Sequence, residues 1–165
     1  MKKFFYVLPI CLFILTGCNK NAETKIVFMC KGLLSSSHTQ NNGTTLETPL
    51  KEINPTLTVS YIPVSTTNEL NKKSDVWLIE SDHPDFTFVT NNHRSENVVE
   101  HMSVVVDEKS IRVNSSYLTQ GHDKTVKLLI NRSSGEIVKE EVNFVPEFVN
   151  PQTSKYKGVC EKGPN

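Results

Sequence analysis

The sequence has no excess of charge of either sign, since 18 basic side chains balance 18 acidic ones. A protein that binds nucleic acid or anionic lipid headgroups through charge needs a clear basic excess, and this sequence has none. Internal repeats and runs of like charge are also absent, which excludes repeat architectures and charged tails. We therefore expect one domain with no nucleic-acid partner.

Local catalytic motifs are absent as well. The sequence contains no nucleophile elbow, no zinc-protease helix motif and no phosphate-binding glycine loop. These absences argue against the common enzyme classes that carry such motifs, and we expect no cofactor. A catalytic site assembled from separate strands leaves no local trace, so an enzyme remains an alternative.

Metal-ligand spacing is missing among the histidines. None of the five falls at the two-ligand spacings of helical or knuckle metal sites. The best local cluster is Asp82-His83-Pro84-Asp85, whose carboxylates and imidazole suit a metal or a shared proton. We favour a turn there, because Asp and Pro are typical turn residues between two strands. The histidines are His38, His83, His93, His101 and His122, and a metal site at the cluster would need a further ligand such as His93 or His122.

Two other side chains could have either a functional or a structural role. Trp77 is the single tryptophan, and it shares a strand face with Ile79, which favours core packing over a binding anchor. His101 shares a face with Val99 and Val105, which predicts a partly buried or rim position. Asn42, Asn114 and Asn131 begin glycosylation-like triplets that we interpret as polar turns.

The only long apolar run lies at the start of the chain, where Lys2 and Lys3 precede Phe4 to Leu15. Such a pattern is typical of an export signal, and the run is too short to span a bilayer as a helix. The segment Leu15-Thr16-Gly17-Cys18 resembles the lipobox of bacterial lipoproteins. An ordinary membrane anchor or secretory signal with a chance cysteine is the alternative.

The lipoprotein resemblance implies cleavage before Cys18 and attachment of lipid to that cysteine, which would anchor the chain to a membrane. Asn19 stands where an aspartate would favour retention in the inner membrane, so the resemblance implies the periplasmic face of the outer membrane. The expected organisation is a signal peptide at 1–17, a lipidated tether at 18–24 and one β domain at 25–165.

The resemblance leaves only two cysteines for the folded domain, because it implies that Cys11 lies in the signal and that Cys18 takes lipid. The periplasm is oxidising, so we expect a disulfide between Cys30 and Cys160, with two unpaired buried thiols as the alternative. A disulfide between positions near opposite ends of the domain predicts that the first and last strands are neighbours.

Alternating apolar residues in short runs separated by turn residues predict a mainly β fold, in which a single antiparallel sheet curls as a barrel or sandwich. Helical signals are weak and allow at most one or two short helices, from Thr48-Pro49 to before Pro55 and around Asn68 to Lys72. Ser35 to Thr45 is predicted as a loop, and Gly135 as the left-handed residue of a hairpin turn. The expected strands are 25–30, 56–62, 75–80, 86–90, 98–107, 110–114, 125–131, 136–144 and 156–160.

In outline, a lipidated antiparallel domain closed by terminal cysteines resembles small periplasmic lipoproteins of the lysozyme-inhibitor type. The Ser-Gly-x-x-Tyr segment and the later Lys-Gly pair of those inhibitors have no counterpart here, because Tyr156-Lys157-Gly158 stands in a different context. No inhibitory residue is carried over.

The function most consistent with these features is non-enzymatic binding of a protein or envelope component through surface loops. One alternative is a carrier whose curled sheet encloses a lipid or other apolar ligand. Another is a hydrolase of an envelope polymer, with Asp82, His83 and Asp85 as its local candidates. The sequence does not predict an oligomeric state.

Overall fold

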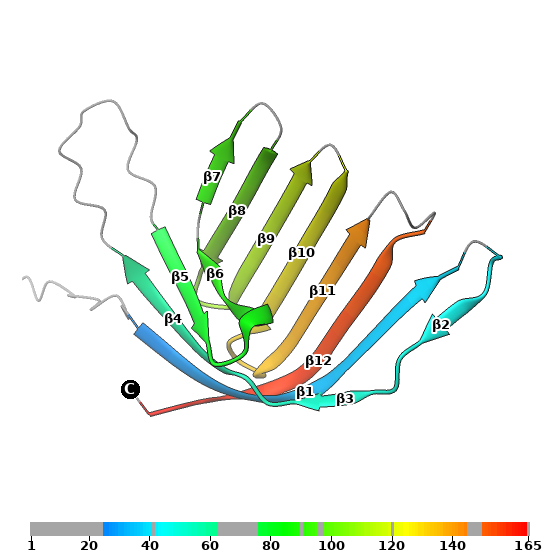
Figure 1. Cartoon of the computed structure of the whole chain (residues 1–165). Coiled ribbons are helices and arrows are strands. Elements are labelled where there is room, and N and C mark those ends of the chain that lie inside the picture. The colour runs from blue at the N-terminus through cyan, green and yellow to red at the C-terminus, as the bar shows by residue number, and fades with distance from the viewer. Residues whose placement is uncertain are drawn as a thin grey trace, which may run out of the picture.

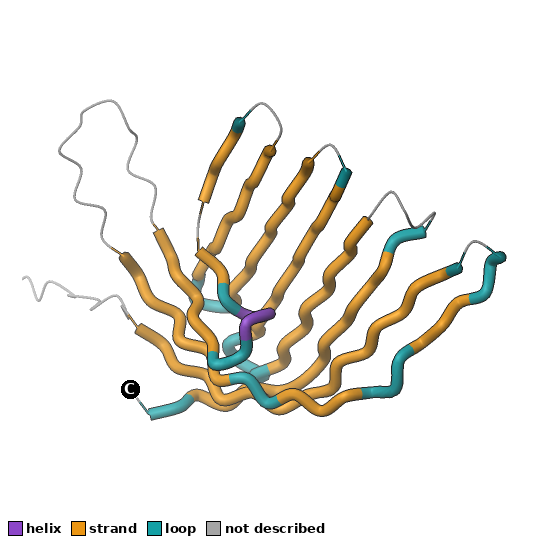
Figure 2. The backbone as a smooth tube through the Cα atoms, in the orientation of Figure 1, coloured by secondary structure: helices purple, strands orange, loops and turns teal. Residues whose placement is uncertain are grey.

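Antiparallel strands make up most of the computed structural model, which describes residues 25–40, 42–62, 76–89, 91–95, 98–119, 121–144 and 150–164. One short 3-10 turn, η1 (Pro84–Phe86), interrupts the strands in this part of the chain (Figure 2). The strands are β1 (Lys25–Thr39), β2 (Thr45–Glu47), β3 (Lys51–Ile53), β4 (Thr56–Ile62), β5 (Val76–Ser81), β6 (Phe88–Val89), β7 (Asn91–Arg94), β8 (Val98–Val106), β9 (Ser110–Thr119), β10 (His122–Asn131), β11 (Glu136–Phe144) and β12 (Gln152–Lys162).

All strands belong to a single sheet in the order β6-β5-β4-β1-β12-β11-β10-β9-β8-β7. The sheet curls until β5 and β6 contact β8, so that it is nearly closed into a barrel (Figure 1). This confirms the predicted fold class and selects a curled single sheet over a sandwich. The first and last long strands, β1 and β12, pair at the centre of the sheet.

The second edge of β1 is covered by three short strands in succession. Going along β1, β4 pairs with its first residues, β3 with its middle and β2 with its end. Pro49 and Pro55 lie in the two breaks between these strands, where a residue without an N–H does not interrupt a ladder. The Pro55 carbonyl accepts a hydrogen bond of 2.9 Å from the Cys30 N–H. The long central strand is therefore paired along both edges.

The core occupies the inner face of the curled sheet. Alternate residues of each strand point inward, as expected for period-two patterning. In β10, for example, Val126, Leu128 and Ile130 are buried, whereas the residues between them are exposed. The buried apolar side chains are Ile26, Phe28, Cys30, Ile53, Leu57, Val59, Ile79, Phe86, Phe88, Val104, Ile111, Val113, Val126, Leu128, Ile130, Ile137, Tyr156 and Cys160.

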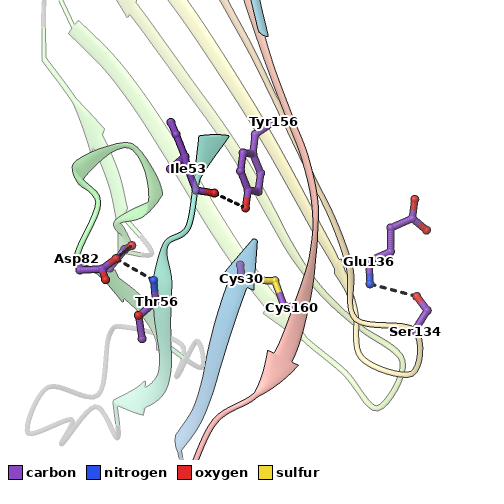
Figure 3. Close-up of a disulfide and its surroundings, with 9 residues drawn as sticks. Cys30, Ile53, Thr56, Asp82, Ser134, Glu136, Tyr156 and Cys160 are labelled. Carbon is purple, nitrogen blue, oxygen red and sulfur yellow. Dashed lines mark hydrogen bonds between the residues drawn. A yellow bond between two sulfur atoms is a disulfide. The ribbon is translucent and has the colours of Figure 1, made fainter. Parts of the chain in front are cut away.

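A disulfide joins Cys30 to Cys160, as predicted (Figure 3). The two cysteines are direct register partners on β1 and β12, so the bond links neighbouring strands across a sequence separation of 130 residues. The turn after β10 packs onto this bond, because Gly135 accepts a hydrogen bond of 2.7 Å from the Cys160 N–H. Gly135 has φ of +73°, which confirms its predicted left-handed conformation.

Two glycines lie opposite each other near the midpoints of β1 and β12. Gly32 is the register partner of Gly158, and the Tyr156 ring lies close to Gly32. The Tyr156 hydroxyl donates a hydrogen bond of 3.2 Å to the Ile53 carbonyl of β3 (Figure 3). Glycine in a strand is typical of tight bends and close backbone approach, and both strands curve along their length (Figure 1). The ring of Tyr156 thus fills the space that Gly32 leaves.

Two local predictions are wrong. The segment expected to begin a helix at Thr48 forms β3 instead, because its backbone pairs with the middle of β1. The predicted loop from Ser35 to Thr45 is mostly strand, since β1 continues to Thr39 and the chain re-enters the sheet at Thr45. Hydroxyl pairs across neighbouring strands stabilise this serine-rich stretch, among them Ser37 with Thr153 at 2.8 Å. The predicted helix at 68–72 lies outside the described residues.

Several strand boundaries also differ from the prediction. The hairpin after Glu108-Lys109 forms as expected, but β9 runs on to Thr119 rather than ending at Asn114. Asp107 stabilises its turn by accepting hydrogen bonds of 2.8 and 2.7 Å from the N–H groups of Lys109 and Ser110. The predicted strand at 86–90 is divided between η1 and β6, and the polar strand β7 was not predicted.

Candidate functional site

The inner face of the sheet changes from apolar to polar toward the end at which β9, β11 and β1 finish. One cross-strand row on this face runs through Tyr117, Lys124, Asn143, Gln152 and His38. The next row inward contains Glu141, Ser154 and Ser36. We call these eight residues, together with His122, the mouth. The strands around it splay apart toward this end of the molecule (Figure 1).

A ladder of charges marks the boundary between the core and the mouth. Lys139 is 4% exposed, and its Nζ lies 2.9 Å from Oε2 of Glu141 and 5.3 Å from the centre of the Phe86 ring. The other carboxylate oxygen of Glu141 is 2.8 Å from Nζ of Lys124. The buried ammonium is therefore compensated by a carboxylate and by the face of an aromatic ring.

Glu141 is the central acid of this ladder. Burial raises the pKa of its carboxyl, but hydrogen bonds from Lys124 and Lys139 outweigh burial and leave the pKa below its usual value. The carboxylate is thus ionised at neutral pH and forms ion pairs with both lysines. Its polar environment suits positioning and hydrogen bonding rather than proton transfer near neutral pH.

Two rings and an amide form the adjacent wall of the mouth. His122 Nε2 hydrogen bonds to Oδ1 of Asn143, and the His122 ring meets Tyr117 edge to face with 5.9 Å between centroids. These contacts connect β9, β10 and β11 through side chains. The amide and both rings remain partly exposed.

A groove of about 240 Å³ lies beside this wall, between the ends of β1, β11 and β12. A second hollow of about 410 Å³ shares Ser36, Ser37, Thr48 and Thr153 with the first, but its other residues on β1 and β12, Ser35 and Lys155, face outward. The first groove is lined entirely by polar side chains, namely Ser36, Ser37, His38, Thr48, Glu141, Asn143, Gln152, Thr153 and Ser154.

The predicted cluster around His83 lies in the turn that follows β5, and its groups hold that turn together. Asp82 accepts a hydrogen bond of 2.8 Å from the Thr56 N–H at the start of β4 (Figure 3). His83 Nδ1 accepts one of 3.4 Å from the Asp85 N–H, and the His83 ring packs edge to face on Phe86. The hydrogen bond from Thr56 holds the pKa of Asp82 below its usual value. These contacts support the turn interpretation.

The other predicted residues are distributed over the sheet. Trp77 packs against the core beside Tyr61, as expected, with 5.3 Å between ring centroids. His101 is exposed on the outer face, so the prediction of partial burial is wrong, because Met102 and Val104 face inward in place of Val99 and Val105. His93 lies in β7, and His38 and His122 belong to the mouth. Within the described ranges, no group of three His, Cys, Asp or Glu side chains is arranged to hold a metal.

The mouth was not predicted from the sequence. A local signal exists in β11. Lys139, Glu141 and Asn143 alternate along the strand in step with the buried Ile137, so they lie on the same inward face. Polar residues at successive inward positions indicate a strand that leaves the core and enters a polar site. The lipidation residue Cys18 and the lipobox lie outside the described residues.

Comparison with protein families, curated proteins and solved structures finds no match for this chain. Within the part of the chain that the structure describes, no helix is long and apolar enough to cross a membrane.

Proposed function

We propose that this chain is a lipoprotein of the bacterial periplasm whose non-enzymatic β domain binds an envelope component at the mouth. The observation that carries the binding role is the division of the inner face into a filled apolar end and an open polar end. Sites that bind ligands are concave and present convergent polar groups, and the mouth has both properties.

The proposed attachment to a membrane rests on the lipobox at Leu15 to Cys18. A tether of seven residues, 18–24, would precede β1 and reach about 25 Å when extended. This length would hold the domain close to the lipid surface while leaving the mouth free to turn toward the periplasmic space. The disulfide is consistent with an oxidising compartment.

A carrier of apolar ligands is less well supported. Phe86, Tyr156 and Ile137 are each at most 1% exposed, and the Phe86 and Tyr156 rings contact each other at 5.0 Å. The apolar part of the inner face is thus filled by the protein's own side chains. A lipid chain would have to displace this packing, which stabilises the fold.

A hydrolase built on Asp82, His83 and Asp85 is also less well supported. Asp82 and His83 accept backbone hydrogen bonds that shape the β5 to β6 connection. The nearest oxygen of Asp85 lies 3.8 Å from His83 Nδ1, too far for a hydrogen bond that would activate the imidazole.

The proposed lipid anchor is tested by replacing Cys18 with alanine in the native host. We expect Cys18→Ala to abolish incorporation of labelled palmitate and to release the protein from the membrane fraction. Labelled protein that stays in the membrane after this change would disprove lipidation at Cys18. Leu15→Asp, which disrupts the lipobox but keeps the cysteine, should give the same result.

The binding role is tested by a photo-crosslinking amino acid placed at Gln152 in the mouth of the lipidated protein in living cells. A matched control carries the same group at Lys127, which is exposed on the outer face of β10. We expect a discrete adduct from position 152 and none from position 127. Equal adducts, or none from either position, would contradict binding at the mouth.

A further inference from the structure

We infer that the polar groove in the mouth binds a saccharide chain of the cell envelope. This inference rests on the proposed function and specifies the ligand of the same site. It is carried by the chemistry of the groove lining and by the free hydrogen-bonding capacity of that lining.

The lining matches a polyhydroxylated ligand. All nine side chains of the first groove carry hydroxyl, amide, imidazole or carboxylate groups. Sugar hydroxyls both donate and accept hydrogen bonds, as do serine and threonine hydroxyls, and amides offer both functions in one group. A ligand rich in hydroxyl groups can therefore satisfy the lining at many points.

Part of the lining is free to bond a ligand. Among the described residues, the side chains of Ser36, His38, Gln152 and Ser154 make no hydrogen bond with other protein groups, and all four are partly exposed. They come from only two strands, since Ser36 and His38 lie on β1 and Gln152 and Ser154 on β12. Their direct cross-strand pairing places them side by side.

A protein partner fits this groove less well than a saccharide. Protein interfaces depend on apolar and aromatic anchors that enter desolvated pockets, and the first groove has no apolar side chain. An anionic ligand is also disfavoured, because Glu141 is the charged acid of the lining and the nearby Lys124 and Lys139 are both paired to it. The remaining class is a neutral polar ligand.

The surroundings of the groove favour a chain over a single sugar. The first groove is smaller than the pockets of about 300 to 1,000 Å³ that enclose drug-sized ligands. On one side, the second hollow is lined mainly by outward-facing residues of β1 and β12, such as Ser35 and Lys155, so it does not extend the groove. On the other side, Asn143 connects the groove to the rings of His122 and Tyr117, whose apolar faces can pack against a sugar ring.

The test is titration of the full lipidated protein, in detergent micelles, with two saccharide probes. One is a soluble oligomer of N-acetylglucosamine, the neutral amino sugar of peptidoglycan strands, and the other is a neutral O-polysaccharide released from lipopolysaccharide. Binding of either probe supports the inference, and the difference between them identifies the source of the saccharide. Binding of neither overturns it.

A variant locates the binding. Ser36→Ala/Ser154→Ala removes two free hydroxyls with little change of volume, and we expect it to weaken saccharide binding about tenfold, since one hydrogen bond contributes about 0.5 to 1.5 kcal/mol. Ser103→Ala/Ser116→Ala, on the outer faces of β8 and β9, is the matched control and should bind like the wild type. Unchanged affinity in the groove variant, with thermal unfolding also unchanged, would overturn the inference.

The two proposals fail in different ways. If neither saccharide binds but the crosslinker at position 152 captures a defined protein, the domain binds at its mouth and the saccharide inference is wrong. If neither saccharide binds and position 152 gives no adduct, both proposals are wrong.

Discussion

Gly32 and Gly158 face each other across β1 and β12, and neither position has room for a side chain. A Cβ atom on Gly32 would lie 2.4 Å from the Lys157 carbonyl oxygen, and one on Gly158 would lie 2.3 Å from that of Lys31. Because both obstacles are backbone atoms of the central strand pair, a side chain rotation cannot relieve them. This glycine pair is what lets the two central strands approach and curve together.

Gly32→Ala should therefore destabilise the domain by about 1 to 3 kcal/mol, the usual cost of overpacking a core. The matched control is Gly121→Ala, because a Cβ there meets nothing within 4 Å. Urea unfolding followed by circular dichroism measures both. Equal stabilities of the two variants would show that the sheet can adjust its curvature at the glycine pair.

Removal of the disulfide should destabilise the domain. Cys30→Ala/Cys160→Ala frees a loop of 130 residues in the unfolded chain, and we expect a loss of about 2 to 5 kcal/mol. Chemical unfolding of the variant and of reduced wild-type protein should give similar midpoints. A variant as stable as the oxidised protein would show that strand pairing alone holds β1 against β12.

The Tyr156 hydroxyl should make stability depend on alkaline pH. Burial raises the pKa of Tyr156 from 10.0 to about 12, so the folded state retains a proton that the unfolded state loses. Its contribution is complete below pH 10 and is lost as the pH rises through 12. Tyr156→Phe, which loses the hydrogen bond to Ile53, should be about 1 kcal/mol less stable at pH 8. This difference should shrink above pH 10; a constant difference in urea unfolding would contradict the assignment.

Glu141 should contribute to stability at neutral pH and lose this contribution in acid. Its folded pKa lies below the usual 4.5, so the contribution is present above pH 4.5 and disappears as the pH falls through the folded pKa. Glu141→Gln should cost about 1 to 3 kcal/mol at pH 7, because Lys139 stays buried without its counter-charge. Thermal unfolding across pH 3 to 7 should show the variant and the wild type converging in acid. The exposed Glu140→Gln is the control, and a loss as large as that of Glu141→Gln would argue against a special role for the buried pair.

Asp82 should stabilise the domain by holding the turn that follows β5. Asp82→Ala removes the acceptor of the Thr56 N–H and should cost about 1 kcal/mol, whereas Asp82→Asn keeps an acceptor oxygen and should cost less. Urea unfolding measures the difference. If Asp82→Asn folds with wild-type stability but fails to complement a deletion strain, the carboxylate has a chemical role and the hydrolase alternative regains support.

The amino-acid pattern was sufficient to predict most strands and the disulfide. Period-two alternation is local information, so segments such as Thr125 to Asn131 and Glu136 to Phe144 were identified as strands. The cysteine pair followed from the lipoprotein resemblance, which assigns Cys11 to a signal peptide and Cys18 to lipid. The serine-rich end of β1 and the short β3 were missed because their stabilising partners are remote in sequence, as Ser35 and Lys155 are.

The residues of the mouth are brought together by the tertiary structure alone. Ser36, Ser154 and Glu141 are ordinary polar residues in their own segments, and only the register of β1, β12 and β11 places them in one row. A register shift of one residue would turn each of them to the opposite face. Composition and periodicity determined that this chain forms a β-sheet held by one disulfide. Pairing across the sheet determined which polar side chains share an inner surface, because that depends on contacts between residues far apart in the chain.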